Sequence, residues 1–299
     1  MTDQLRFDGL VAVVTGGGGG LGRAHALELG RRGAHVVVND MGVELAGDGS
    51  DVGRAATVAK EIEAAGGSAA PDTNSVATAE GGAAIVETAI REFGRIDVVV
   101  NNAGILRDRT FVKTSPDDVG PVLDVHLAGA FNVTRPAWAH FREQGFGRVV
   151  MTSSSAGFFG NFGQASYASA KLGLVGLIKV MAIEGAKYDI KANAIGPVAR
   201  TRMTEKFDNP LADVLGVERV SPAVAFLSHP SCALSGEVLS VGGGRVARVF
   251  VGVTRGYLGG ELTAEDIRDN LETIFDDEGY QVPGDSKAEM RLLAEMLGR

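Results

Sequence analysis

The sequence has few of the residues from which covalent frameworks and metal sites are built. Cys232 is the single cysteine in 299 residues, which excludes a disulfide framework and a thiolate metal site and favours a reducing compartment. Histidine is also scarce. His25, His35, His140 and His229 are scattered, with no carboxylate or second histidine at the spacing of metal ligands. We therefore expect no metal site.

Long apolar runs and an excess of basic residues are missing as well. No segment reaches the roughly 18 consecutive apolar residues that a membrane span needs, and the polar N-terminus lacks the apolar core of a signal peptide. Acidic residues outnumber basic ones by 37 to 29, for a net charge of −8, which argues against a nucleic-acid or anionic-membrane surface. We expect a soluble, cytoplasmic protein with neither nucleic acid nor membrane as a partner.

Glycine, in contrast, is abundant. It fills 42 of the 299 positions, about twice its usual share. Proline occupies only 9 positions and hydrophobic residues make up 45% of the chain, so neither collagen nor disorder explains the excess. The positions of the glycines must therefore explain it.

Short apolar runs alternate with longer helical patterns along the first 240 or so residues, which predicts strand–helix–strand units. The runs are apolar on both faces, as in parallel strands covered by helices. We expect a Rossmann-type α/β fold, a doubly wound parallel sheet with helices on both faces. The predicted strands are Leu10–Thr15, His35–Asn39, Asp97–Asn101, Arg148–Thr152, Lys191–Ala194 and, as the last one, Glu237–Val241. The predicted helices are Leu21–Arg32, Asp51–Ala65, Thr78–Phe93, Ser115–Gln144 and Ala165–Lys187.

The character of the chain changes near residue 245. We expect residues 1–244 to form the catalytic domain and residues 245–299 a helical extension without its own core. The extension would pack on the domain or on a partner subunit. Its predicted helices are Thr263–Asp276, with Thr263 as the N-cap, and Ser286–Leu297.

A glycine cluster lies between the first predicted strand and the first predicted helix. Gly16 to Gly20 are consecutive glycines, and Gly22 follows. In this position glycines let backbone N–H groups approach a pyrophosphate at the helix N-terminus. Asp40 ends the second strand 18 residues after Gly22, close to the spacing of a carboxylate that binds the adenosine ribose. The pattern predicts a dinucleotide site, and the carboxylate favours NAD over NADP; a flexible loop and a solvated strand end are the alternatives.

A tyrosine and a lysine stand four residues apart at the start of an apolar helix. Tyr167 and Lys171 therefore share one helix face. A lysine ammonium at that distance favours tyrosinate and is expected to lower the tyrosine pKa. Such a tyrosine can take a proton from an alcohol or return it to a carbonyl. The alternative is an exposed helix pair.

Hydroxyl groups follow the strand that precedes this helix. Residues 152–155 read Thr-Ser-Ser-Ser, at the carboxyl edge where open α/β sheets place their sites. One of these hydroxyls can orient the reacting oxygen toward Tyr167. Ser154 lies thirteen residues before Tyr167.

Together these motifs resemble the short-chain dehydrogenase/reductase family. The resemblance rests on Thr15-Gly-x-x-x-Gly-x-Gly22, Asn101-Asn-Ala-Gly104 and Ser154 before Tyr167-x-x-x-Lys171. It implies alcohol–carbonyl interconversion with NAD, Tyr167 as acid/base, Lys171 on the ribose, Ser154 on the substrate, and a homodimer or homotetramer. The implied cofactor contacts are Gly16, Gly18, Gly20, Leu21, Gly22, Asp40, Asn74, Ser75, Val76, Asn102, Ala103, Gly104, Tyr167, Lys171, Pro197 and Thr201.

A closer resemblance is to the (3R)-hydroxyacyl-CoA dehydrogenase units of type 2 peroxisomal multifunctional enzymes. It rests on Val36–Asp40, Arg95–Arg109, Gly160–Gln164 and Arg202–Thr204. It implies oxidation of a 3-hydroxyacyl-CoA thioester to the 3-oxo thioester. A hydroxysteroid or other secondary alcohol is the alternative substrate, and a non-catalytic NAD-sensing module is the alternative function.

The sequence departs from the family pattern at three places. His126 stands where the wider family has a proton-relay asparagine, and its ring or only its carbonyl would take part; a buried structural histidine is the alternative. Asn74 replaces an aspartate that contacts adenine. Val198 follows Pro197 in place of glycine, in the segment that the resemblance expects to contact the nicotinamide carboxamide through Ile195 and Thr201.

Two arginines follow the Asn-Asn-Ala-Gly motif. Arg107 and Arg109 lie in the loop after it. We interpret them as a solvated loop face, with an acidic group of coenzyme A as the alternative partner.

Overall fold

The computed structural model describes residues 4–44, 46–47, 51, 53–200 and 211–299. These residues form two compact units, Met1–Arg248 and Val249–Arg299. The boundary falls four residues after the predicted one, because the strand β8 (Arg245–Val249) belongs almost entirely to the first unit. Each unit is described by itself.

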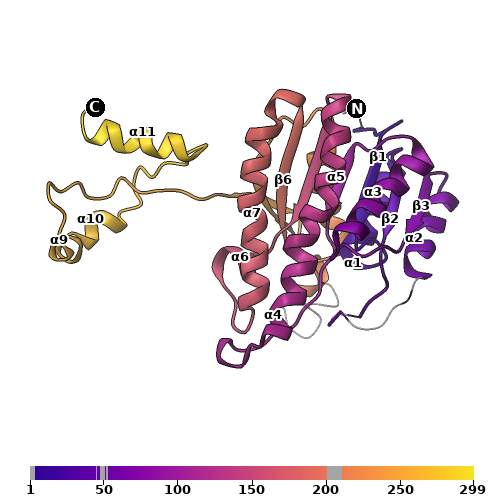
Figure 1. Cartoon of the computed structure of the whole chain (residues 1–299), viewed down its shortest axis with the longest axis horizontal. Helices are drawn as coiled ribbons and strands as arrows, with labels where there is room; N and C mark the ends of the chain where they lie inside the picture. The colour runs from indigo at the N-terminus through magenta and orange to yellow at the C-terminus, as the bar shows by residue number, and fades with distance from the viewer. Residues whose placement is uncertain (1–3, 45, 48–50, 52, 201–210) are drawn as a thin grey trace. The chain divides into compact units, whose positions relative to one another are not determined.

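The first unit is built on an eight-stranded sheet (Figure 1). The strand order is β3-β2-β1-β4-β5-β6-β7-β8, and the pairs from β3 to β7 are all parallel. The order changes direction between β1 and β4, which is where doubly wound sheets open a ligand crevice. The predicted fold class is confirmed. The strands are β1 Val11–Thr15, β2 His35–Asn39, β3 Ser68–Asp72, β4 Val98–Asn101, β5 Gly147–Thr152, β6 Ile190–Pro197, β7 Val238–Gly242 and β8 Arg245–Val249.

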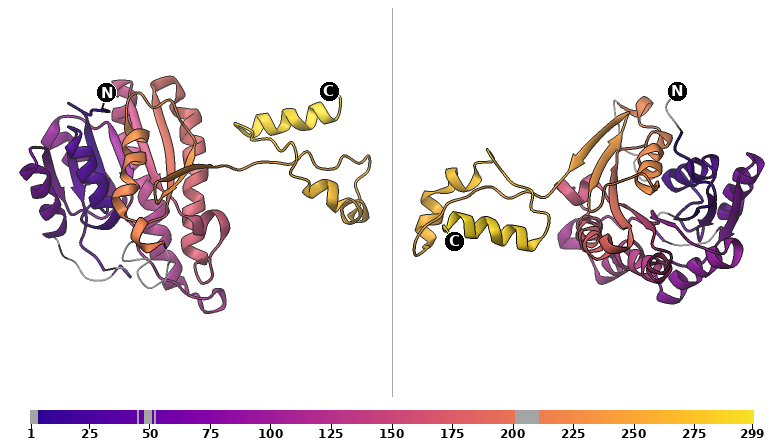
Figure 2. Two further views of the ribbon diagram at one scale, coloured as in Figure 1. Left: turned by 180° about the vertical axis from the view of Figure 1, so that it is seen from behind. Right: turned by 90° about the horizontal axis from the view of Figure 1, so that it is seen from above.

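Helices cover both faces of this sheet (Figure 2). In the described chain, α3, α5 and α7 pack on one face, and α1, α2 and α8 pack on the other. The central strands are buried on both sides, as their apolar sequences predict. The helices are α1 Gly20–Arg31, α2 Gly53–Ala64, α3 Ala79–Phe93, α4 Pro116–Leu123, α5 Gly129–Gln144, α6 Ser155–Phe159, α7 Ala165–Gly185, α8 Ser221–Ser228, α9 Ala264–Asp269, α10 Leu271–Phe275 and α11 Ser286–Met296.

The predicted single helix Ser115–Gln144 is interrupted. A π-helical turn, Asp124–Ala128, separates α4 from α5. The turn places His126 against the backbone of Ile105, with which its ring nitrogen makes a hydrogen bond. A π turn adds one residue to a helix and is frequent at functional sites. Hydrophobic periodicity predicts one continuous helix here and does not show this insertion.

Two strands escaped the sequence analysis. The sequence of β3 is Ser-Ala-Ala-Pro-Asp, which has no β-branched residue, and Pro71 is tolerated because β3 is an edge strand. The prediction that Glu237–Val241 is the last strand is wrong, because β8 follows β7 after a two-glycine turn at Gly243 and Gly244. Because most residues of β8 are exposed, its sequence lacks the apolar run by which the other strands were predicted. The helices α6 and α8 were not predicted either.

The helix α7 is the one segment of the described chain that is long and apolar enough to span a membrane. This test rests on length and composition alone, and the segment Ala165–Tyr188 passes it. In the structure α7 packs against β6 and β5, and Ala170, Leu174 and Ile178 are buried in this contact face. The contacts are those of a core helix in a sheet protein.

The second unit has no core of its own. None of the residues from Val249 to Arg299, all of which the structure describes, is buried. The predicted helix Thr263–Asp276 is broken at Asn270 into α9 and α10. Its predicted N-cap is confirmed, because Thr263 and Asp266 form a reciprocal capping box. What this unit packs against stays a prediction.

Candidate active site

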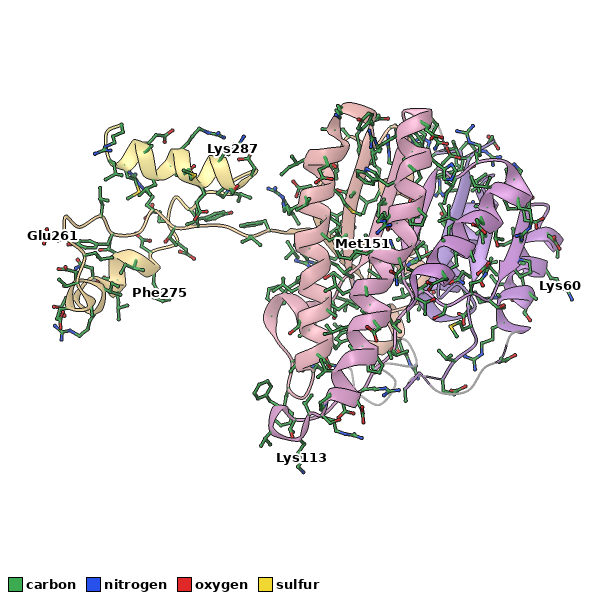
Figure 3. All side chains as sticks on the ribbon, in the orientation of Figure 1. Lys60, Lys113, Met151, Glu261, Phe275 and Lys287 are labelled. Atoms are coloured by element: carbon green, nitrogen blue, oxygen red, sulfur yellow. The ribbon has the colours of Figure 1, made fainter. Side chains whose placement is uncertain are left out.

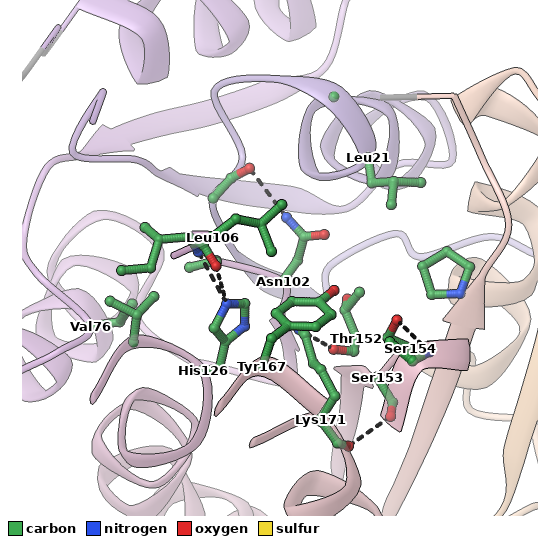
Figure 4. A pocket seen from close by; sticks show the side chains of 18 of the residues that line it. Leu21, Val76, Asn102, Leu106, His126, Thr152, Ser153, Ser154, Tyr167 and Lys171 are labelled. Atoms are coloured by element: carbon green, nitrogen blue, oxygen red, sulfur yellow. Dashed lines mark hydrogen bonds between the residues drawn. The ribbon is translucent and has the colours of Figure 1, made fainter. Parts of the chain in front are cut away.

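A cavity of about 520 Å³ opens at the carboxyl ends of the central strands, at the point where the strand order changes direction. Its volume is in the usual range for small-molecule sites. Gly18 and Gly22 do not line it, and Thr201 lies outside the described residues. The predicted site residues that do line it (Figure 4) are Gly16, Gly20, Leu21, Asp40, Asn74, Ser75, Val76, Asn102, Ala103, Gly104, His126, Ser154, Tyr167, Lys171 and Pro197.

The glycine cluster forms a turn that leaves room for a ligand at the start of α1. Gly16 has a φ of +63°, and a Cβ there would lie 2.8 Å from the Cα of Ala103. A Cβ at Gly22 would collide with the carbonyl of Gly16. The N-cap residue of α1, Gly19, offers no side-chain acceptor, so the first N–H groups of the helix can bind an anion. This cradle fits the pyrophosphate of a dinucleotide.

Asp40 is fixed by the same turn. Its Oδ2 accepts a hydrogen bond of 2.8 Å from the amide of Gly18, and its Oδ1 accepts one of 2.7 Å from the amide of Gly42. A Cβ at Gly18 would lie 2.8 Å from Oδ2, so only glycine allows this approach. Gly18 does not line the cavity. It acts indirectly, because its amide orients the Asp40 carboxylate that is predicted to bind ribose. Gly22 also lies outside the cavity lining, and it acts through its close packing against the carbonyl of Gly16.

The Asn-Asn-Ala-Gly motif is tied to the end of β1. Thr15 Oγ1 accepts hydrogen bonds from the amides of Asn102 (3.0 Å) and Ala103 (3.1 Å). The Asn102 side chain donates to the Thr15 carbonyl at 3.1 Å. Asn101 points the other way and donates to Thr134 at 2.8 Å. The motif thus holds the floor of the cavity between β1 and β4.

Asn74 is exposed but is hydrogen-bonded to two buried polar residues, Asp72 and Asn39. Its Nδ2 and its backbone amide each donate 2.9 Å hydrogen bonds to the carboxylate of Asp72. Asn39 donates to Asp72 (2.8 Å) and to the carbonyl of Asn74 (2.9 Å). The family pattern has an aspartate at position 74. Here the carboxylate belongs to Asp72, two residues earlier, and it is buried. The cavity wall at this point presents an amide.

Tyr167 and Lys171 lie one turn apart on α7 and both reach the cavity, as the sequence predicts. Lys171 Nζ donates a 2.6 Å hydrogen bond to the carbonyl of Thr152 and lies 5.5 Å from the centre of the Tyr167 ring. Ser154 is the N-cap of α6 and lies beside Tyr167 (Figure 4). Ser153 donates to the Lys171 carbonyl at 2.7 Å, so it links β5 to α7. The end of β5 and the start of α7 therefore act as one unit.

The electrostatics of this pair differ from the expected ones. Burial raises the pKa of Tyr167 above its usual value; a hydrogen bond with Ser154 lowers it, and the Asp108 carboxylate raises it. Burial also lowers the pKa of Lys171, to about 7. The expectation that Lys171 lowers the tyrosine pKa is therefore wrong for this structure. The lysine nitrogen donates to Thr152, and burial of the phenol has the largest effect on the tyrosine pKa.

His126 is a buried neutral residue with a backbone partner. Its Nε2 lies 2.8 Å from the carbonyl oxygen of Ile105 and 3.1 Å from the amide of the same residue. The ring packs edge-on against Tyr167, with centroids 5.1 Å apart. Burial holds the pKa of His126 well below its usual value, and the nearby Lys171 charge lowers it further. The side chain thus joins the Asn-Asn-Ala-Gly loop to the catalytic helix.

The two arginines after this loop have different surroundings. Arg107 is half-buried and donates to the carbonyls of Ala46 (2.9 Å) and Asp117 (2.8 Å). It therefore clamps neighbouring loops, which the prediction of a solvated loop face missed. Arg109 is exposed, as predicted, and contacts the carbonyl of Asp108.

Several cavity residues were not predicted. Ile195, proposed to contact nicotinamide, is instead fully buried in β6 and does not line the cavity. The additional lining residues lie near the predicted positions in sequence, on either side of them, and this proximity is the one signal that would have found them. They are Gly19, Asn39, Met41, Val43, Ile105, Leu106, Val125, Thr152, Ser153, Ser155, Ala156, Phe159, Gly160, Asn161, Gln164 and Ala199.

Across the described ranges, no three or more histidine, cysteine, aspartate or glutamate side chains gather closely enough to hold a metal ion. The ionisable side chains that line the cavity are those of Asp40, His126, Tyr167 and Lys171, and its other polar groups are hydroxyls and amides. Such groups bind through hydrogen bonds and move protons.

A glycine cradle, a carboxylate after β2 and a tyrosine–lysine–serine group at one sheet edge define a nicotinamide-dependent dehydrogenase that acts on CH–OH groups. The comparison with protein families agrees. The model of the short chain dehydrogenase family matches residues 10–211. The chain belongs to this family.

Three relatives place the chain within the family. The mouse peroxisomal multifunctional enzyme type 2 is 47% identical over 281 residues, which cover 92% of this chain and 38% of that enzyme. The hydroxyacyl-CoA dehydrogenase ChsB1 of Mycobacterium tuberculosis is 40% identical over 265 residues, which cover 83% of this chain and 82% of that protein. The structure of the full-length multifunctional enzyme type 2 from Drosophila melanogaster has a TM-score of 0.83 at 37% identity. That match covers 98% of this chain and 50% of the other, so the chain spans about half or less of the multifunctional relatives.

Proposed function

We propose that the protein is an NAD-dependent dehydrogenase that interconverts (3R)-3-hydroxyacyl-CoA and 3-oxoacyl-CoA thioesters. The observation that carries the proposal is the cavity itself, which joins the dinucleotide cradle at Gly16 to Ser154 and Tyr167. The motif resemblance and the name of the relative hydroxyacyl-CoA dehydrogenase support the acyl-CoA substrate. Asp40, which is fixed by two backbone amides, supports NAD over NADP.

The residues of the site suit this chemistry. The nicotinamide, when bound, supplies or accepts the hydride at the carbinol carbon. Ser154 donates a hydrogen bond to the substrate oxygen and holds it beside the phenol of Tyr167. Because burial keeps Tyr167 protonated at neutral pH, it can donate a proton to the carbonyl in reduction and must release one before it accepts the proton in oxidation. Protonated Lys171, 5.5 Å from the ring centre, stabilises the negative charge that develops on oxygen.

A non-catalytic sensing role is disfavoured by the same residues. A sensor needs the cradle but not the proton-transfer group, and this chain has Tyr167, Lys171 and Ser154 on one cavity wall. We therefore retain the dehydrogenase as the proposed function.

The assembly and location are proposed from composition and exposed surface. We expect a homodimer or homotetramer, since α7 exposes Leu172, Val180 and Ile183 and the unit Val249–Arg299 lacks a core. The unit would pack on the first unit or on a partner subunit. We expect a cytoplasmic protein without nucleic-acid or membrane partners, in line with its acidic composition and its one buried cysteine.

The test is a turnover assay with matched substrates. NADH formation is followed with (3R)- and (3S)-3-hydroxybutyryl-CoA, with longer 3-hydroxyacyl-CoA thioesters and with hydroxysteroids. The proposal expects the (3R) thioesters to have the highest kcat/KM, and Tyr167→Phe to remove turnover while NADH still binds. A higher kcat/KM for hydroxysteroids, or activity in Tyr167→Phe, would contradict it.

A further inference from the structure

Four large apolar side chains are exposed next to the cavity. Phe111, Val112, Phe159 and Phe162 have exposed fractions of 84%, 89%, 77% and 87%. We call these four residues the apolar rim. Exposed apolar surface on this scale is unfavourable in water, and where it is contiguous it marks a binding site.

The two loops that carry the rim are joined by backbone hydrogen bonding. The amide of Arg109 donates to the carbonyl of Gly163 at 2.9 Å, and Arg109 pairs with Gln164 as an isolated parallel bridge. Figure 3 shows the first loop, with Lys113, beside the turn that leads into α7. The side chain of Gln164 donates to Asp108 at 2.8 Å and accepts from Asn161 at 2.9 Å. These hydrogen bonds therefore hold together the two loops that carry the rim.

The rim reaches the cavity through Phe159. Phe159, Gly160, Asn161 and Gln164 line the same cavity as Tyr167. The segment 155–164 connects Ser154, which would hold the substrate oxygen, to the helix of Tyr167. A substrate whose carbinol carbon lies at Ser154 and Tyr167 can therefore extend along this segment toward Phe159.

The chemistry of the rim indicates which part of the substrate it contacts. Its four side chains carry no charge and no hydrogen-bonding group. The nucleotide part of coenzyme A carries phosphates, which need cations or N–H groups. A hydrocarbon chain needs only apolar area.

We infer that the apolar rim binds the hydrocarbon tail of the acyl group and makes the enzyme selective for long or bulky acyl chains. This inference rests on the proposed function. It predicts that affinity grows with tail length until the rim is covered. Each added CH2 that contacts the rim raises kcat/KM about two- to fourfold.

The experiment separates this inference from the proposed function. Binding of S-alkyl-CoA thioethers, from butyl to hexadecyl, is measured by calorimetry on the enzyme with NADH, so that no turnover is needed. The same chain-length series of (3R)-3-hydroxyacyl-CoA substrates is assayed for turnover. Tighter binding with longer alkyl chains supports the rim even if the thioesters are not oxidised, which would overturn only the proposed function. Turnover of the short thioester together with a flat chain-length dependence would overturn only the rim.

Variants locate the effect. Phe159→Ser and the double variant Phe111→Ser/Phe162→Ser are expected to lower kcat/KM for the hexadecanoyl substrate at least about tenfold, while the butyryl substrate changes less than about twofold. Val246→Ser, at a valine that is 58% exposed in β8, is the control and should change neither. Sedimentation tests the other possible occupant. If the double variant dissociates into smaller species and keeps the wild-type chain-length dependence, the rim is an interface between copies and the inference is wrong.

Discussion

Lys171 Nζ donates a 2.6 Å hydrogen bond to the carbonyl oxygen of Thr152, which ends β5. The lysine thereby joins the catalytic helix to the strand that leads to Ser154. Its side chain is 3% exposed, and this burial lowers its pKa to about 7. The same contact that positions the site therefore places a cation where the surroundings disfavour charge.

Replacing Lys171 should increase stability while it removes activity. Between pH 7 and 10.5 the unfolded chain holds the lysine proton and the folded chain does not, given a folded pKa of about 7 against 10.5. This lysine therefore destabilises the fold at pH 7, and the deficit shrinks as pH rises, by up to about 1.4 kcal/mol per pH unit. Lys171→Met should be more stable than wild type at pH 7, with the difference falling by pH 9. Urea unfolding at both pH values measures it; a variant equally destabilised at both would contradict the expectation.

His126 should act by positioning and not by titration. Its Nε2 contacts Ile105 and its ring contacts Tyr167, while burial keeps its pKa well below the usual value. His126→Ala should lower kcat about ten- to a hundredfold through misplacement of the loop and the tyrosine. The pH profile of kcat should keep its shape, and His126→Asn should recover part of the rate. A loss of one ionisation from the profile would instead indicate proton transfer by the ring.

A methyl group at Gly22 should weaken cofactor binding. The added Cβ meets the Gly16 carbonyl and must displace the phosphate turn. Gly22→Ala is expected to raise the Kd for NADH at least about tenfold, which corresponds to about 1.4 kcal/mol. Gly120→Ala is the control, because a Cβ there meets nothing within 4 Å. Fluorescence titration with NADH compares the two, and equal affinities would show that the turn adapts.

Asp40 should set the preference between the two nicotinamide dinucleotides. Its carboxylate, held by Gly18 and Gly42, would repel a 2′-phosphate. Asp40→Asn keeps one acceptor oxygen and removes the charge, so the ratio of the Kd for NADP to that for NAD should fall at least about tenfold. Asp51→Asn, on an exposed residue of the following loop, serves as the control. Tighter binding of NADP than NAD by the wild type would show that the assignment of Asp40 is mistaken.

His25 should make the fold sensitive to acid. Its Nδ1 lies 2.9 Å from the Ser221 hydroxyl, and burial lowers its pKa to about 3 from 6.5. Below pH 6.5 His25 becomes protonated in the unfolded chain but stays neutral in the folded chain. The free energy of unfolding therefore falls between pH 6.5 and 3, by up to about 1.4 kcal/mol per pH unit. His25→Gln should reduce this slope, whereas Ser221→Ala, which keeps the histidine, should not. Denaturation series at pH 5 and 7 provide the measurement, and an unchanged slope in His25→Gln would count against the buried neutral histidine.

The sequence predicts the central strands and the flanking helices well because both faces of β1, β2 and β4 are apolar and buried. It misses β3 and β8, whose edge positions need little apolar character. Tertiary context decides these strands, because pairing with β2 makes β3 a strand and pairing with β7 makes β8 one, although neither has a strong strand pattern of its own.

The candidate site follows the same rule. Motif spacing brings Gly16, Asp40, Ser154, Tyr167 and Lys171 to one cavity, because strand ends share one edge of a parallel sheet. Spacing cannot show where the lysine nitrogen points or how much water surrounds the phenol. The direction of the tyrosine pKa shift depends on both, so sequence reasoning alone gave the wrong sign.

The π-helical turn between α4 and α5 contains one residue more than a regular helix would need. The fold does not require this residue, but the position of His126 does. A π turn is a single-residue insertion into an α-helix, so deleting Leu127 would restore a regular helix without changing the phase of α4 relative to α5. The deletion would turn His126 relative to the residues that follow it and break its contact with Ile105. A shortened chain of this kind would fold around an intact sheet and have a misaligned catalytic wall. The presence or absence of this one residue can thus distinguish an enzyme from a protein of the same fold that only binds its ligand.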